Sequence, residues 1–448
     1  MEKLSEFDFL PLHYNGDGDP TAAPVDELTQ HIDQAGVTDV VLFAHGFRNN
    51  EQEARTLYAD FLEAFRAHIG RDELEDRLAA RRLVVGGIFW PSKAFPEGPS
   101  KDDAGSVQGL GDADAEMAAT RARLEELRDD DVRPEQRATV DRALSLLDSL
   151  EDNTDAQDEF VRLVLSLVDD GQDDPTEGLS ELKAQDGSEI LAKLGTPIIV
   201  PTVRDDEGGG ALAVSGEAVS AGDGKPLFVS GFFKSIAGRV GQVLNLTTWY
   251  MMKNRSGEVG AKGVAAAVRA IRAARPSVRI HLVGHSLGGR CMTACAKALA
   301  AEPQVRPDSL SLLEAAYSHY GLSPNNGRGS AGFFRDVLAG KVVKGPFIST
   351  YSYQDTVVGK AYAISSRLAG DNVQEVGDKD DQFGGIGRNG SQLTPESNDH
   401  KMHQVGDAYT FSLDVVNNVD GSGGAIKDHG DVTNPRVTYA FACAMAQT

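Results

Sequence analysis

Short apolar runs alternate with longer amphipathic stretches along the first part of the chain. Residues 37–44 (Val-Thr-Asp-Val-Val-Leu-Phe-Ala) and residues 82–90 are β-branched apolar runs of strand length, typical of buried parallel strands. Between them, apolar residues recur at spacings of three and four over residues 57–65, which predicts an amphipathic helix. An asparagine before this helix suits its N-cap. Strand, helix and strand in succession indicate an α/β fold with right-handed crossovers.

The pattern changes over residues 92–230. Three helices are predicted there, at residues 113–129, 134–152 and 154–168, and acidic loops join them. We interpret residues 92–230 as a mostly helical acidic insertion between two segments of an α/β core, residues 1–91 and 231–448. Two interpretations of the insertion stay open: a cap or lid over the active site, and a solvated appendage.

The α/β pattern resumes after the insertion. We expect a helix over residues 259–275, a strand over 280–283, two further strands over 310–314 and 347–353, a last strand over 409–413, and a closing helix over 432–446 interrupted at Pro435. The expected architecture is a mostly parallel central sheet flanked by helices.

The negative charge of the chain is concentrated in one segment. The formal net charge is −23, and residues 101–190 alone carry 26 Asp and Glu against 9 Lys and Arg. Such a field repels nucleic acid and anionic membrane surfaces, so we expect neither as a partner of that segment.

Three cysteines provide no disulfide framework, and no cysteine–histidine cluster has the spacing of a metal site. We therefore expect no metal and no organic cofactor. The first residues lack a basic segment followed by an apolar core, and no apolar run has the length of a membrane span. A cytoplasmic protein without a transmembrane segment is the expectation, although export without a signal peptide stays open.

Residues 278–290 contain the motif with the most chemistry. An apolar run leads into Gly284-His-Ser-Leu-Gly288, and a helix rich in small residues follows. This is the strand, sharp turn and helix of a nucleophile elbow, in which the turn strains the serine backbone and lifts its hydroxyl above the sheet. The motif predicts Ser286 as a nucleophile.

A serine needs an imidazole to take its proton, and the imidazole needs a carboxylate to fix its tautomer. In this fold the chain order is Ser, then Asp or Glu, then His. Asp355 lies just beyond a convincing strand and is the favoured acid, with Glu314 as the second candidate. His429 lies in a loop before the final helix and is favoured as the base over the other candidates, which are His319, His400 and His403.

The oxyanion hole needs two backbone N–H groups. Leu287, directly after the serine, and Phe47, after the strand that ends at residue 44, are the predicted donors. His45, His285 and Trp249 are candidates for lining the substrate pocket. The aromatic pairs at residues 232–233 and 333–334 are further candidates, and all of these aromatic residues are at least as compatible with a core position.

These motifs together resemble the α/β-hydrolase superfamily, and more narrowly bacterial predicted hydrolases of its esterase/lipase branch. The resemblance covers most of the chain outside residues 92–230, and it implies that Ser286, Asp355 and His429 form a catalytic triad. The matching stretches are residues 42–47, 89–92, 252–255, 281–288, 315–320, 355–359, 361–362, 387–390 and 429–431.

The expected function is therefore hydrolysis of carboxylic esters through an acyl-enzyme, with a small-molecule or lipid-like ester as substrate. Two alternatives stay open: a serine hydrolase for amide, peptide or thioester bonds, and a catalytically silent protein that keeps the fold and binds partners. The sequence does not specify the acyl or alcohol group.

Overall fold

The computed structural model describes residues 1–22, 24–34, 36–92, 113–169, 174–195, 218–221, 225–229, 235–368 and 379–448. The chain forms two compact units. The first comprises Met1–Ser92, Arg255–Val358 and Gly384–Thr448, and the second comprises Lys93–Asn254 and Gly359–Phe383. The second unit thus contains residues 93–230 of the predicted insertion together with residues 231–254 and 359–383, which the sequence assigned to the core.

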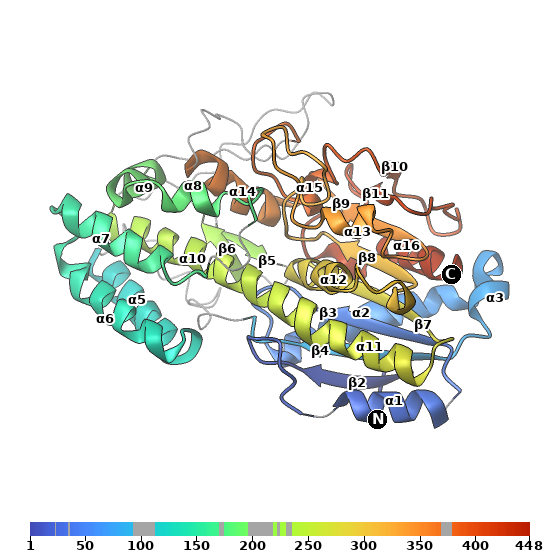
Figure 1. The fold of residues 1–448 in the computed structure, drawn as a ribbon. Helices are drawn as coiled ribbons and strands as arrows, with labels where there is room; N and C mark the ends of the chain where they lie inside the picture. The colour runs from blue at the N-terminus through green and yellow to red at the C-terminus, as the bar shows by residue number, and fades with distance from the viewer. Residues whose placement is uncertain are drawn as a thin grey trace. The chain divides into compact units, whose positions relative to one another are not determined.

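The first unit is an α/β structure around a mostly parallel nine-stranded sheet (Figure 1). The strand order is β1-β2-β4-β3-β7-β8-β9-β11-β10, and only the pair β1 and β2 is antiparallel. The strands are β1 (Glu2–Leu4), β2 (Phe7–His13), β3 (Asp39–Ala44), β4 (Leu83–Phe89), β7 (Arg279–His285), β8 (Ser309–Leu313), β9 (Phe347–Tyr351), β10 (Ser397–Lys401) and β11 (Val416–Asp420).

Helices cover both faces of this sheet (Figure 1). One face packs against α1 (Pro24–Gln34), α11 (Ala265–Ala274) and α12 (Leu287–Ala298), and the other against α2 (Glu51–Ile69), α3 (Asp72–Leu78) and α16 (Pro435–Ala446). On the second face the rings of Phe61 and Phe65 lie 5.4 and 5.0 Å from that of Phe441, and all three are buried. Burying a side chain of this size contributes roughly 1.5–3 kcal/mol. The helices on the two faces thus hold the sheet in place, together with the loops at the ends of its strands.

The helix termini follow the local sequence. Asn50 accepts from the backbone N–H of Glu53, and the Glu53 carboxylate accepts from the N–H of Asn50, which completes a capping box at the start of α2. Pro435 is the first residue of α16 and Asn434 is its cap, so the proline begins this helix instead of interrupting it.

The predicted strand over residues 409–413 is wrong. Tyr409 and Phe411 are buried in the core beside α16, but their backbone forms no strand. The strand lies at Val416–Asp420, where two asparagines, Asn417 and Asn418, occupy the interior of the sheet. Asparagine disfavours strands, and here side-chain hydrogen bonds satisfy both amides, a compensation that the local sequence does not reveal.

The helix predicted from residue 259 begins much earlier. It runs through α10 (Ile236–Glu258), a π-helical turn (Val259–Val264) and α11. Gly260 in the π-helical turn packs directly on α12, because a Cβ at Gly260 would lie 1.9 Å from the carbonyl oxygen of Cys291. Only glycine allows this approach. Two short helices, α13 (Arg335–Ala339) and α15 (Ile386–Asn389), and the longer α14 (Thr356–Leu368) lie further along the chain.

The second unit has its own helical core. Phe160 and Val164 on α7 are buried together with Val140 on α6 and Leu191 on α9. Deeper in the unit, Lys253 donates to the Glu177 carboxylate, which also accepts from the Tyr362 hydroxyl at 2.7 Å. The elements are α5 (Ala113–Glu126), α6 (Arg137–Leu146), α7 (Thr154–Leu165), α8 (Leu179–Lys183), α9 (Gly187–Leu194) and the antiparallel pair β5 (Ala218–Ala221) and β6 (Lys225–Val229).

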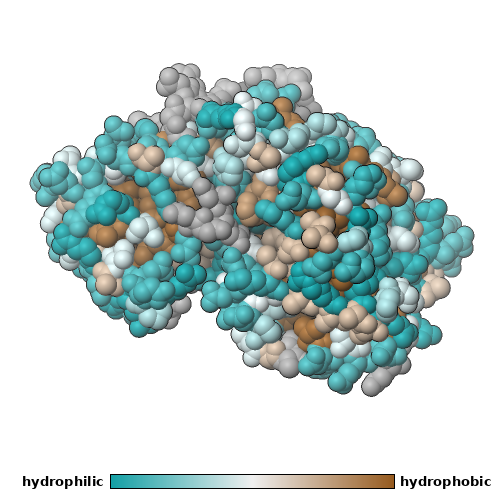
Figure 2. Space-filling model, in the orientation of Figure 1, coloured by the Kyte–Doolittle hydropathy of each residue, from teal (hydrophilic) through white to brown (hydrophobic). Residues whose placement is uncertain are grey.

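The visible surface is mostly hydrophilic (Figure 2). Among the described residues, the large hydrophobic side chains classed as exposed are those of Met1, Leu393 and Leu413. Over the same residues, none of the helices combines the length and the apolar character that crossing a membrane requires.

Candidate active site

Ser286 lies in the sharp turn between β7 and α12, at the carboxyl edge of the sheet (Figure 1). Its backbone has φ 56° and ψ −124°, a combination that residues other than glycine rarely adopt. Residues held in such regions cost of order 1–3 kcal/mol and persist only where the surroundings impose them. Here the Ser286 N–H donates to the Leu313 carbonyl on β8, and the Ser286 carbonyl accepts from the Ala316 N–H.

The two glycines of the motif make this turn sterically feasible. A Cβ at Gly284 would lie 2.2 Å from the carbonyl oxygen of Gly288, and a Cβ at Gly288 would lie 2.1 Å from that of Ala44 on β3. Any side chain at either position would push α12 away from β7 and β3. The strained serine is therefore held from both sides of the turn.

Asp355 and His429 are in direct contact. The His429 Nδ1–H donates to Oδ2 of Asp355 at 2.7 Å, and both side chains are buried. The other carboxylate oxygen of Asp355, Oδ1, accepts from the N–H of Val358 at 2.9 Å and so caps α14. Asp355 therefore serves both as a helix cap and as the partner of the imidazole.

The loop that carries His429 is fastened to the loop that carries Asp355. The Ser352 hydroxyl donates to the carbonyl of Ile426 at 3.0 Å, and the N–H of Tyr353 donates to the hydroxyl of Ser422 at 2.9 Å. β9 and β11 are neighbours in the sheet, so both loops leave the same edge. These bonds fix the spacing between Asp355 and His429.

His285 connects the elbow to the His429 loop. Its Nε2–H donates to the backbone carbonyl of His429 at 2.9 Å, and the two rings lie 4.8 Å apart. This contact brings the residue before Ser286 against the predicted base. Among the described residues, however, no hydrogen bond joins the Ser286 hydroxyl to the His429 ring. Such contacts are often long in ligand-free enzymes and tighten when substrate binds.

The loop after β3 lies against the serine. A Cβ at Gly46 would be 2.7 Å from the Ser286 Cβ and 3.2 Å from its hydroxyl oxygen, so the Gly46 backbone borders the hydroxyl. Phe47 follows directly. Leu287 is the first residue of α12, and the first N–H groups of a helix have no acceptor within it. Of the two predicted donors, Phe47 thus follows the glycine that borders Ser286, and Leu287 follows Ser286 itself.

His45 holds the same loop by its ring and its backbone. Its Nδ1–H donates to the carbonyl of Gly46 at 2.9 Å, and its own carbonyl accepts from the indole N–H of Trp90 at 3.1 Å. The His45 and Trp90 rings stack with their centroids 5.6 Å apart. Because the Gly46 carbonyl is fixed in this way, the orientation of the peptide between Gly46 and Phe47 is fixed as well.

Burial keeps the two flanking histidines neutral. Desolvation lowers the pKa of His45 to about 4. Burial, and then the charge of His429, lower the pKa of His285 to about 3. Neutral rings act as single N–H donors with a defined tautomer, which suits the main-chain contacts that both make. Neither His45 nor His285, predicted as pocket residues, is substantially exposed.

The other sequence candidates have other hydrogen-bond or ring partners. Glu314 follows β8 and is fully buried. Its Oε1 accepts from the Thr350 hydroxyl at 2.9 Å, and burial raises its pKa well above the usual value. The His319 ring lies 4.0 Å from the Tyr320 ring and is tilted 54° from its plane. The rings of His400 and His403 bond to the Asn417 side chain and the Asp407 carbonyl, respectively.

The aromatic residues predicted as pocket candidates do not lie together. Trp249 belongs to the second unit and is buried there against Lys253. Phe333 and Phe334 pack beneath the guanidinium of Arg290. Residues 232–233 lie outside the described residues.

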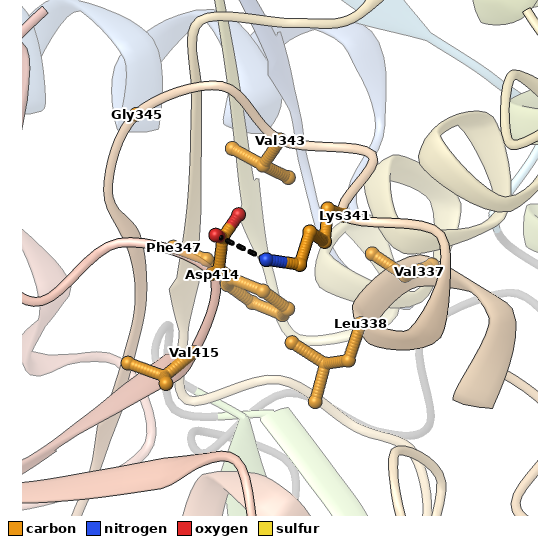
Figure 3. Close-up of a pocket in the computed structure, with 8 residues that line it drawn as sticks. All are labelled: Val337, Leu338, Lys341, Val343, Gly345, Phe347, Asp414 and Val415. Atoms are coloured by element: carbon orange, nitrogen blue, oxygen red, sulfur yellow. Dashed lines mark hydrogen bonds and ion pairs between the residues drawn. The ribbon is translucent and has the colours of Figure 1, made fainter. Parts of the chain in front are cut away.

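A small pocket lies at the amino ends of β9 and β11. Figure 3 shows the residues that line it. Its empty volume is about 210 Å³, and Lys341 and Asp414 form an ion pair of 2.7 Å across it. It lies at the start of β9 and just before β11, far along both strands from the edge that carries Asp355 and His429. It is therefore separate from the serine site.

Sequence reasoning missed Arg388 on α15, whose side chain is fully buried and donates to the backbone carbonyl of Asp355 at 3.1 Å. Its only trace in the sequence is the Gly-Arg-Asn-Gly run at residues 387–390, which has no spacing relation to the triad. Within the described residues no group of His, Cys, Asp and Glu is arranged to hold a metal ion.

Comparison with known proteins returned no match: no family model, no curated protein and no solved structure is similar to this chain.

Proposed function

We propose that the protein is a serine hydrolase that cleaves carboxylic esters, built on an α/β-hydrolase fold in which the acidic segment is an insertion. The observation that carries the proposal is the buried hydrogen bond between His429 and Asp355, at the same sheet edge as the strained Ser286. A carboxylic side chain, a base with a fixed tautomer and a serine on an elbow are the parts that acyl transfer requires.

In the proposed reaction, the Ser286 hydroxyl attacks the ester carbonyl while Nε2 of His429 accepts its proton. Asp355 stabilises the resulting imidazolium through Oδ2. The N–H groups of Phe47 and Leu287 bind the oxyanion, and Nε2 then protonates the leaving alcohol. Water hydrolyses the acyl-enzyme by the same route, which regenerates the serine and releases the carboxylic acid. Acyl transfer of this kind needs no metal or organic cofactor.

The geometry supports this proposal at two further points. The hydrogen bond of the His429 Nδ1–H leaves Nε2 as the basic nitrogen, as a general base for serine requires. The closeness of the Gly46 backbone to the serine hydroxyl supports the proposal that this loop supplies an N–H donor to the oxyanion.

The test is hydrolysis of p-nitrophenyl esters of increasing acyl length by the full-length protein and by Ser286→Ala. Removing a triad nucleophile lowers kcat by roughly 10⁶-fold in a serine hydrolase. A fluorophosphonate probe should label the parent protein and leave Ser286→Ala unlabelled. Ester turnover by Ser286→Ala at the parent rate would refute the nucleophile assignment.

Two other results would change the proposal. Labelling of Ser286 without ester turnover, together with cleavage of amide or thioester substrates, would assign another acyl bond. Absence of both labelling and turnover in the folded parent protein would favour a catalytically silent role.

A further inference from the structure

Arg388 is a buried cation beside the loop that carries Asp355. Its side chain has no exposed surface, and Nη1 donates to the backbone carbonyls of Tyr353 and Asp355, the second at 3.1 Å. The guanidinium also lies 4.2 Å from the centre of the Tyr353 ring. Burying a charge is costly unless hydrogen bonds compensate it, so these contacts are needed to keep the side chain in place.

The short helix that carries Arg388 is fastened to two strand ends. The Gly387 N–H donates to the carbonyl of Ala315 after β8 at 2.9 Å, and the Gly387 carbonyl accepts from the N–H of Ser352 after β9 at 3.0 Å. A Cβ at Gly387 would lie 2.4 Å from the carbonyl carbon of Glu314, so only glycine allows α15 to approach so closely. Arg388 is therefore presented from a fixed backbone.

The two carbonyls that Arg388 binds bracket the turn leading to the acid. The Asp355 N–H donates to the Ser352 carbonyl at 2.9 Å, which closes this turn. With the main-chain carbonyls of Tyr353 and Asp355 held by the guanidinium, the Asp355 side chain is directed to its two other contacts, Val358 and His429. A charge-assisted hydrogen bond is roughly twice as strong as a neutral one.

We propose that Arg388 is a positioning residue that sets the orientation of Asp355 and, through it, the tautomer and direction of the His429 ring. This inference rests on the proposed function, because it assigns a task to Arg388 only if Asp355 and His429 act on Ser286. Arg388 itself does not touch the reacting atoms.

Arg272 provides a matched control at the opposite edge of the sheet. It is also a nearly fully buried arginine, and it donates to the carbonyls of Pro276, Val278 and Arg306 at the amino ends of β7 and β8. It also forms an ion pair of 2.8 Å with Asp308, so its removal should cost at least as much stability as the removal of Arg388. Removing either guanidinium takes away hydrogen bonds to main-chain carbonyls beside strand ends of the same sheet. Only the removal of the Arg388 guanidinium should change the positions of the Asp355 and His429 side chains.

The experiment compares Arg388→Lys and Arg388→Met with Arg272→Lys and Arg272→Met in the full-length protein. We expect Arg388→Met to lose roughly 10²-fold in kcat, since a displacement of about 1 Å costs that much, with KM changed only a few-fold. Arg388→Lys keeps the charge but not the planar fork, so it should recover part of the loss. The Arg272 variants should lower stability and leave kcat within about twofold of the parent.

A spectroscopic readout separates positioning from mere stability. The proton shared by His429 and Asp355 should give a downfield ¹H resonance in the parent, which Asp355→Asn abolishes and so assigns. We expect this resonance to shift or broaden in Arg388→Met and to be unchanged in Arg272→Met. If Arg388→Met does not fold, Arg388→Lys is compared with Arg272→Lys by the same two measurements.

Two failures are distinguishable. If the folded parent neither hydrolyses esters nor labels at Ser286, the proposed function fails, and the inference about Arg388 fails with it. If the parent is active and Ser286→Ala is not, while the Arg388 variants keep the parent kcat and resonance or lose no more than the Arg272 variants, only the inference about Arg388 is overturned.

Discussion

The replacement of Asp355 by asparagine tests the site most directly, because the two carboxylate oxygens have different partners. Oδ1 accepts from the N–H of Val358 and Oδ2 accepts from the Nδ1–H of His429. Asparagine has a single oxygen. If that oxygen stays on Val358, the amide N–H faces Nδ1 and forces the proton to Nε2, where it blocks acceptance of the serine proton. If the oxygen turns to His429, two N–H donors meet at Val358.

Either arrangement disables the base or misplaces it, so the cost should fall on turnover. A triad acid replaced by its amide loses about 10⁴-fold in kcat, equal to about 5.5 kcal/mol of transition-state stabilisation. Losing a hydrogen bond to a charged group costs about 1.5–3 kcal/mol of folding stability, so Asp355→Asn should remain folded at moderate temperature. The assay is kcat with a short-chain p-nitrophenyl ester, alongside thermal unfolding.

Asp414→Asn is the matched control. Asp414 is half exposed and pairs with Lys341 at the other edge of the sheet, so its replacement should change kcat by less than about twofold. The proposed role of Asp355 is refuted if Asp355→Asn, folded and free of the parent protein, keeps kcat within tenfold of the parent while Ser286→Ala is inactive.

Three further predictions concern the neighbours of the proposed triad. Burial raises the pKa of Glu314, so above the ordinary pKa of a glutamate the unfolded chain releases a proton that the folded state retains. The parent therefore loses folding stability as pH rises. Glu314→Gln should be more stable than the parent at pH 8, equal to it near pH 4, and still active. Urea unfolding at both pH values checks this, and equal stability at pH 8 would contradict it. At position 285, glutamine can place an N–H near the position of the His285 Nε2, and asparagine cannot. His285→Gln should therefore keep kcat within about tenfold of the parent, while His285→Asn loses roughly 10²-fold, both measured with the same ester. Equal losses would show that the contact with His429 does not cause the loss. Gly46→Ala should slow fluorophosphonate labelling of Ser286 by roughly 10²-fold, because the new methyl group occupies the space beside the hydroxyl, and labelling at the parent rate would remove Gly46 from the site.

The local part of this structure was predictable from the sequence. The turn around Ser286 depends on a buried strand, two glycines and a following helix, all within about ten residues, so the pattern and the steric reason lie together in the chain. Local patterns also predicted the strand before Asp355 and the position of His429 in a loop. Whether Ser286 hydrolyses esters stays a prediction.

Tertiary contacts decided the rest. The strand at Val416–Asp420 was missed because its buried asparagines bond to groups distant in the chain, the backbone carbonyl of Phe347 for Asn417 and the carboxylate of Asp399 for Asn418. The hydrogen bond between His429 and Asp355 depends on β9 and β11 being neighbours, although β10 lies between them in sequence.

The run at residues 387–390 did not reveal the role of Arg388, because a buried arginine and an exposed one are the same letter in the sequence. Its partners are backbone carbonyls, which every residue possesses, so no pairing of residue types marks the contact. The sequence by itself determined which elements form and which residue types stand at their ends. The folded structure alone determined which of those ends meet, because the distance between two strand ends depends on the order of strands in the sheet and not on their separation along the chain.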